Sequence, residues 1–240
     1  MIASVFNPEG TASVLLICEH ASNHVPPGYA SLGLSAHDLA RHIAWDPGAL
    51  PLAQALSRHI DAPLVFANVS RLVIDLNRQP GERDSIPQIS ETTCIPGNLD
   101  LAASEADARA AAFYHPFHQV LEDLAEARRP AALISIHSFT PVYKGIGRPW
   151  HAGVITARQC PLGARILAAL KTDPAVVAGL NVPYAPSDRV YHTLDRHARA
   201  HQAMTAMVEI RNDLIRDASG QRDWALRLAG AIGSALQGCE

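Results

Sequence analysis

The sequence predicts a three-layer α/β fold in which a mostly parallel, mixed sheet lies between helices on both faces. Short apolar runs rich in branched residues alternate with helical patterns along the whole chain, and several runs are hydrophobic without interruption, as strands buried on both faces are. Of the 240 residues, 48% are hydrophobic and 18% are charged, so the chain can bury a large core. Neither an internal repeat nor a linker is visible, and we expect a single domain over residues 1–240.

Periodicity, caps and helix breakers predict the individual elements. Residues 13–18 are apolar throughout, which indicates a buried strand, and Ser35 is a suitable cap for the helix that follows. Residues 79–99 are rich in Pro, Gly, Ser and Thr and predict a long surface loop of the kind that often covers a substrate. Pro116 is expected to kink or divide the longest helical pattern. The predicted strands are 13–18, 63–69, 131–136, 153–156 and 206–210, and the predicted helices are 35–43, 47–60, 101–129, 162–170 and 223–236, with a loop and a short polar helix over 181–196.

Three of the predicted strands end in side chains suited to a metal site. His20 follows the strand at 13–18, His137 follows the strand at 131–136, and Glu209 lies near the end of the strand at 206–210. Ligands of open α/β sheets bind beyond the carboxyl ends of the strands. Catalytic zinc takes three ligands from His and Asp or Glu, and a nearby carboxylate can accept a proton from the water it activates. We therefore expect His20 and His137 as zinc ligands and Glu209 as the general base.

The third ligand is open at this point. Glu19, Asn23 and Asp46 are all candidates, and Asp46 precedes Pro47-Gly48, where a loop carboxylate could point back into a cleft. A serine or cysteine hydrolase is the competing chemistry. The sequence contains no GxSxG motif, and Cys18 lies inside an apolar run where a thiol is usually inert.

Composition excludes several other classes. The net charge is −3 and no basic run stands out, which argues against a nucleic-acid partner. There is neither an 18-residue apolar run nor a signal peptide, so we expect no membrane segment and a cytoplasmic protein. The four cysteines form no CxxC pair and predict reduced thiols rather than a disulfide framework or a cysteine zinc site. None of this excludes an oligomer.

Six segments occur in an order that resembles the N-formylglutamate amidohydrolase family. The resemblance runs from about residue 13 to residue 225. The segments are CEHASNHVPP (18–27), DPGA (46–49), SRLVIDLNR (70–78), HPFH (115–118), SIHSFTP (135–141) and VEIRNDLI (208–215).

This resemblance implies a zinc-carboxypeptidase-like, phosphorylase/hydrolase-like fold and the hydrolysis of a small N-acyl amino acid, with formate and glutamate as products when the substrate is N-formylglutamate. The histidines and the carboxylate of the family's motifs fall on His20, His137 and Glu209. The related HxxE pattern is absent, because Asn23 stands three residues after His20. An amide oxygen is a poor zinc ligand, and Asp46 becomes the preferred third ligand.

An N-acyl acidic amino acid carries two carboxylates, so its pocket needs cations or amide donors. We expect these from Arg71, Asn77, Arg78 and Arg211. Each of the three arginines has an acidic neighbour, Asp75 or Asp213, with which it could instead form a structural ion pair. Further candidates are Tyr184 and Tyr191 as donors to an oxyanion, and His115, His118, His192 and His197 for a second metal.

Two alternatives remain beside a metal-dependent amidohydrolase. One is a non-catalytic or differently specific relative that binds a small ligand and keeps the fold after losing a metal ligand; Asn23 is the feature that leaves it open. The other is a metal-independent hydrolase.

Overall fold

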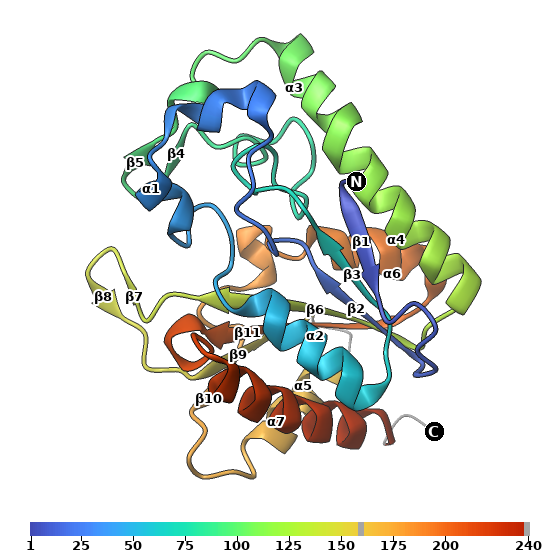
Figure 1. Ribbon diagram of the computed structural model, residues 1–240. Coiled ribbons are helices and arrows are strands. Elements are labelled where there is room, and N and C mark those ends of the chain that lie inside the picture. Colours follow the sequence, from blue (N-terminus) through green and yellow to red (C-terminus); the bar gives the residue numbers. More distant parts are fainter. Residues whose placement is uncertain (158–160, 238–240) are drawn as a thin grey trace.

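A seven-stranded mixed sheet in the order β1-β3-β2-β6-β11-β9-β10 forms the centre of the computed structural model, which describes residues 1–157 and 161–237 (Figure 1). The strands are β1 (Ala3–Phe6), β2 (Val14–Cys18), β3 (Leu64–Ala67), β6 (Ala132–Phe139), β9 (Ala152–Ile155), β10 (Ala178–Leu180) and β11 (Met204–Arg211). Two hairpins lie apart from this sheet: β4 (Ile89–Ser90) with β5 (Thr93–Cys94), and β7 (Val142–Tyr143) with β8 (Ile146–Gly147).

The central strands β3, β2, β6 and β11 are parallel to one another. Strand β1 adds to β3 in the antiparallel direction, β9 runs antiparallel to β11, and β10 is parallel to β9. The carboxyl ends of β2, β6 and β11 therefore lie next to one another at one edge of the sheet, which is where a ligand is expected in this class of fold.

Helices cover both faces of the sheet, so the predicted three-layer α/β class is confirmed. Helices α2, α5 and α7 pack on one face, and α4 and α6 pack on the other (Figure 1). Strand β2 shows why: Val14, Leu16 and Cys18 belong to one core, and Leu15 and Ile17 to the other. The helices are α1 (Ala36–Ala40), α2 (Ala49–Ile60), α3 (Ala103–Arg109), α4 (His115–Arg128), α5 (Pro161–Leu170), α6 (His192–His201) and α7 (Ala218–Gln237).

The structure departs from the predicted elements mainly at edges and ends. The short strands β1 and β10 were not predicted, and β6 continues past the expected end to Phe139, so His137 lies inside the strand. The long helical pattern is divided next to Pro116, although the chain stays helical across the division. A π-helical turn over Ala110–Tyr114 joins α3 to α4 directly before this proline, and the N–H of His115 donates to the carbonyl of Ala110.

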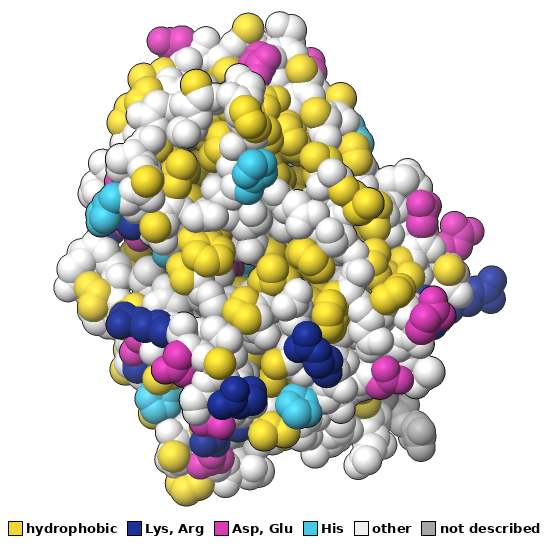
Figure 2. Space-filling view, in the orientation of Figure 1, with side chains coloured by type: hydrophobic (Ala, Val, Ile, Leu, Met, Phe, Trp, Pro, Cys, Tyr) yellow, Lys and Arg dark blue, Asp and Glu magenta, His cyan; other side chains and the backbone are white. Residues whose placement is uncertain are grey.

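The structure also shows the state of two cysteines and the distribution of charge on one face. Cys18 is buried and Cys94 is exposed, both as free thiols, and Cys160 and Cys239 lie outside the described residues. On the face shown in Figure 2, acidic and basic side chains are interspersed along the lower half. Among the described residues, no helix combines the length and the apolar character needed to cross a membrane.

Candidate active site

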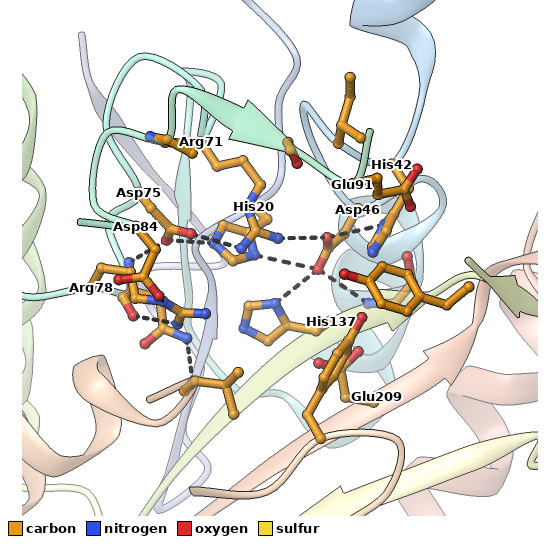
Figure 3. Close-up of a pocket in the computed structure, with 18 of the residues that line it drawn as sticks. His20, His42, Asp46, Arg71, Asp75, Arg78, Asp84, Glu91, His137 and Glu209 are labelled. Carbon is orange, nitrogen blue, oxygen red and sulfur yellow. Dashed lines mark hydrogen bonds and ion pairs between the residues drawn. The ribbon is translucent and has the colours of Figure 1, made fainter. Parts of the chain in front are cut away.

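Two histidines meet at the carboxyl edge of the sheet. His20 lies two residues beyond β2, and His137 lies in the last part of β6 (Figure 3). Their ring centroids are 4.8 Å apart and the rings are nearly perpendicular. Both side chains are buried. The structure thus brings together the two residues that the sequence predicted as zinc ligands.

The carboxylate of Asp46 lies between the two rings. Its Oδ2 is 2.8 Å from Nδ1 of His137 and 3.6 Å from Nδ1 of His20. The backbone N–H of Asp46 donates to the carbonyl of His20 at 2.9 Å, which fixes this loop to the end of β2. Gly48 allows the turn that follows, because its φ is +82° and a Cβ atom would lie 2.4 Å from the carbonyl oxygen of Ile215.

A second carboxylate faces the other side of each ring. Oδ1 of Asp75 is 2.8 Å from Nε2 of His20, and Oε2 of Glu19 is 3.1 Å from Nε2 of His137. The hydroxyl of Ser135 donates to the same oxygen of Glu19 at 2.6 Å. Each Nε2 thus faces an outer carboxylate while each Nδ1 faces Asp46; Nε2 of His20 forms a hydrogen bond with Asp75, and Nε2 of His137 forms an ion pair with Glu19 that lacks hydrogen-bond geometry. Metal-binding histidines are oriented in this way by outer carboxylates, which also make them better ligands.

The buried carboxylates carry more negative charge than the permanent cation beside them can balance. Glu19, Asp46 and Asp75 are all buried, and their pKa values all lie below the usual range, so they are ionised. The guanidinium of Arg71 lies 2.7 Å from Asp75 and 3.7 Å from Asp46. Burial without compensation is costly for such groups. A divalent cation would supply the missing charge.

The excess of buried carboxylates also shifts the pKa values of the site residues in the metal-free protein. Burial opposes a charge on His137, but Glu19 and Asp46 outweigh it and hold the pKa of this histidine well above its usual value. Burial would raise the pKa of Glu19, and His137 instead lowers it to about 2. Burial raises the pKa of Glu209 to about 8, against the lowering effect of His137.

The arrangement of donors fits a metal ion. One ligand atom from each of His20, Asp46 and His137 lies within 4.8 Å of the others. Nδ1 of His20 and Oδ1 of Asp46 are buried polar atoms that lack a hydrogen-bond partner, which native structures rarely leave unexplained. Two imidazoles and one carboxylate are one of the common donor sets of catalytic zinc.

Glu209 lies beside this cluster. It is the register partner of His137 in the parallel pair β6–β11, and its Oε2 is buried without a hydrogen-bond partner. Tyr184 is close enough for Glu209 to influence it, since burial and then the charge of Glu209 raise the pKa of Tyr184 to about 12. NH2 of Arg148 donates to the Tyr184 hydroxyl at 3.2 Å, so this hydroxyl can still donate its own proton.

Glu209 and the His20–Asp46–His137 cluster line a cavity of about 280 Å³ that opens between the sheet edge and the predicted long loop. Its wall includes Ile89, Ser90 and Glu91 from the β4–β5 hairpin of that loop. Of the residues predicted to bind substrate, Arg71, Asn77 and Arg78 line the cavity. Tyr184 lines it as well.

Arg211 does not line the cavity. Its Nε is 2.8 Å from Asp213, and its NH1 contacts carbonyl oxygens of the segment before β9. The side chain of Asn77 is also committed elsewhere, because it donates to the carbonyl of Val190 and accepts from the backbone N–H of Thr193. For Arg211, the structure therefore shows the structural ion pair with its neighbour Asp213.

Two other candidate ligands serve different partners. Asn23 donates to the carbonyl of Leu39, and Glu19 lies behind His137 rather than between the histidines. Tyr191 is buried and is not among the residues that line the cavity. Asp46 is the candidate whose carboxylate faces both Nδ1 atoms.

Sequence reasoning missed three residues of the site. Asp75 was considered only as a partner of Arg71. His42 lines the cavity with Nδ1 3.5 Å from Asp46, and burial lowers its pKa to about 4. Arg148 stacks on the ring of Tyr184, with 4.9 Å between its Cζ and the ring centroid. The spacing of His42 and Asp46, four residues apart, was the available signal for His42.

Comparison with known proteins identifies the family. The model of the N-formylglutamate amidohydrolase family matches residues 12–216. The chain belongs to this family. It is therefore a hydrolase that acts on amide bonds. No curated protein sequence matches the chain.

Solved structures share the fold. A gene product of Agrobacterium tumefaciens is 40% identical, with a TM-score of 0.95 over 99% of this chain and 96% of that one. The N-formylglutamate amidohydrolase of Ralstonia eutropha JMP134 is 18% identical, with a TM-score of 0.67 over 98% of this chain and 97% of that one. The cell shape determinant Csd4 of Helicobacter pylori, bound to a tripeptide, is 11% identical with a TM-score of 0.53, over 98% of this chain and 55% of that one.

Proposed function

We propose that this member of the family removes the formyl group from a small N-formyl amino acid such as N-formylglutamate, and that it depends on one divalent metal ion, with zinc as the expected metal. The observation that carries the proposal is the convergence of two imidazole Nδ1 atoms and one carboxylate beside a buried glutamate. His20, Asp46 and His137 would hold the metal. When bound, zinc polarises a carbonyl group and makes a coordinated water molecule acidic near neutral pH.

The side chains around these ligands have separable tasks. Asp75 keeps His20 in the tautomer that leaves Nδ1 free, because it accepts a hydrogen from Nε2. The carboxylate of Glu19, 3.1 Å from Nε2 of His137, favours a hydrogen on that nitrogen as well. Glu209 accepts a proton from the attacking water molecule and returns it to the leaving amine. Tyr184, held by Arg148, donates a hydrogen bond to the carbonyl oxygen as negative charge develops there.

Recognition of an acidic amino acid falls to Arg71 and Arg78. Both line the cavity, and both are held in place by acidic side chains, Arg71 by Asp75 and Arg78 by Asp84. Guanidinium groups that are already oriented lose little further freedom when they bind a carboxylate, and their planar fork can form two parallel hydrogen bonds.

The test is the release of formate from N-formylglutamate by purified protein, before and after metal removal with a chelator. We expect activity that is lost on chelation, is restored by Zn²⁺, and is stronger for N-formylglutamate than for N-formylleucine, which lacks the second carboxylate. Arg78→Ala should narrow that difference by raising KM for N-formylglutamate. Activity that survives full metal removal would contradict the metal dependence, and equal activity on both compounds would contradict the role of the arginines.

A further inference from the structure

Helices α4 and α6 bring together a second group of metal-ligating side chains on the face of the sheet opposite α2 and α7. Oε2 of Glu122 is 2.7 Å from Nδ1 of His197, and its Oε1 is 3.0 Å from Nε2 of His201. The three ligand atoms lie within 4.8 Å of one another. Of the histidines that the sequence offered as candidates for a second metal (His115, His118, His192 and His197), His197 belongs to this group.

His118 extends this group towards the active site. Its Nδ1 is 2.9 Å from Nε2 of His197, and its Nε2 is 2.9 Å from the carbonyl oxygen of Leu76. The chain of contacts therefore runs from Leu76 through His118 and His197 to Glu122. His118 and His197 are almost completely buried, whereas the side chain of Glu122 is 38% exposed.

The hydrogens along this chain show that it carries one more positive charge than two neutral imidazoles and a carboxylate supply. The contacts from Leu76 to His118, from His118 to His197 and from His197 to Glu122 each need one hydrogen, because a carbonyl and a carboxylate can only accept. Two neutral imidazoles carry only two hydrogens. One more positive charge must therefore lie on the chain, either as a proton or as a metal ion between His197 and Glu122.

We propose that Glu122, His197 and His201 bind a second divalent transition-metal ion, with zinc as the best fit to two imidazoles and one carboxylate. In this arrangement His197 remains neutral, gives its Nε2 hydrogen to His118, and offers Nδ1 to the metal. His118 orients His197 in the way that an outer acceptor orients a metal-binding histidine. His197 and His201 are four residues apart on one helix face, the spacing at which two histidines can share an ion.

The site has a clear structural consequence. The N-terminal end of α6 is tied to the cavity wall, because Asn77 binds the carbonyl of Val190 and the backbone N–H of Thr193. A metal ion that joins the other end of α6 to α4 would hold this helix at both ends. It would stabilise one wall of the active site without touching the substrate.

Zinc titration of chelator-treated, full-length protein by isothermal calorimetry tests the proposal, with circular dichroism to verify the fold. We expect the parent to bind one zinc ion at each cluster, and His201→Ala and Glu122→Gln each to lose one. His59→Ala, which removes an exposed histidine of α2, is the control and should bind as the parent does. Zinc should also raise the melting temperature of His137→Ala, because the second site remains intact there.

The outcomes separate this site from the one proposed for catalysis. If His201→Ala and Glu122→Gln bind as much zinc as the parent, the inference is wrong and the additional positive charge on the chain is a proton. If zinc is lost in these variants but His137→Ala binds as much as the parent, the second site stands and the metal at the catalytic site does not.

Discussion

Replacement of Asp75 by Asn tests the idea that outer carboxylates prepare the histidines for a metal. Asp75 is buried and touches three groups: its Oδ1 lies 2.8 Å from Nε2 of His20 and accepts from the N–H of Asn77 at 2.9 Å, and its Oδ2 lies 2.7 Å from Arg71. An Asn can keep the first two contacts through its oxygen. Its amide group would then face Arg71 with a donor instead of an acceptor.

The expected magnitude follows from these contacts. The negative charge behind His20 is lost, although the ring stays hydrogen-bonded. Removal of such outer partners weakens metal binding by about 10–100-fold. This corresponds to about 1.4–2.8 kcal/mol, within the range of about 1.5–3 kcal/mol for a hydrogen bond to a charged group. We expect kcat/KM to fall by a similar factor at limiting zinc.

The assay is competition for Zn²⁺ against a chromophoric chelator, with circular dichroism to verify the fold. Asp84→Asn is the matched control, because Asp84 also lines the cavity but binds Arg78 and Arg189 rather than a histidine. It should leave zinc affinity unchanged. A folded Asp75→Asn protein with the zinc affinity of the parent would refute the reasoning.

Three further predictions follow from the same geometry. Glu209→Gln should retain zinc while kcat falls by about 100- to 10,000-fold, as measured by formate release, because the proton acceptor is lost; a variant that keeps full activity would rule out Glu209 as the base. Gly48→Ala should unfold at a lower temperature than Gly81→Ala in calorimetry, since both glycines have positive φ but only the new Cβ at residue 48 collides with backbone, at Ile215. We expect Gly48→Ala to lower the free energy of unfolding by about 1–3 kcal/mol. Equal melting temperatures of the two variants would contradict the clash. In metal-free protein, the pKa of Glu209 is about 8 when folded against an ordinary value of 4.5, so between these pH values the folded state binds one more proton than the unfolded state. The free energy of unfolding should therefore fall as pH rises through this range, by up to about 1.4 kcal/mol per pH unit. Urea unfolding should show a flatter pH dependence for Glu209→Gln than for the parent, and parallel curves would contradict this prediction.

The sequence was sufficient for the parts of the site that depend on strand ends. Residues 13–18, 131–136 and 206–210 are apolar enough to identify as buried strands, and side chains at the carboxyl ends of parallel strands lie at a common edge. His20, His137 and Glu209 could therefore be grouped before the strand order was known. Their adjacency depends on the order β2-β6-β11, which periodicity does not encode.

Loop residues were harder to predict because their roles depend on tertiary contacts. Asp75 and His20 are 55 positions apart in the sequence, and no local pattern predicts their contact. Arg211 shows the opposite error. It lies two residues beyond Glu209, yet its guanidinium reaches Asp213 and the carbonyls before β9, so proximity in sequence to a site residue did not place it in the site.

Edges of the sheet were missed for a related reason. Strands β1 and β10 have four and three residues and lie at the two ends of the sheet, where short segments carry little periodic signal. Partner strands define them more than their own sequence does.

The central claim is that His20, Asp46 and His137 hold a metal ion through the two Nδ1 atoms. An anomalous difference map, recorded at the zinc absorption edge from crystals grown with Zn²⁺, tests it most directly. We predict a peak about 2.0–2.2 Å from Nδ1 of both histidines and from an oxygen of Asp46. The absence of a peak there, or a peak on the Nε2 side of His20 next to Asp75, would contradict the account.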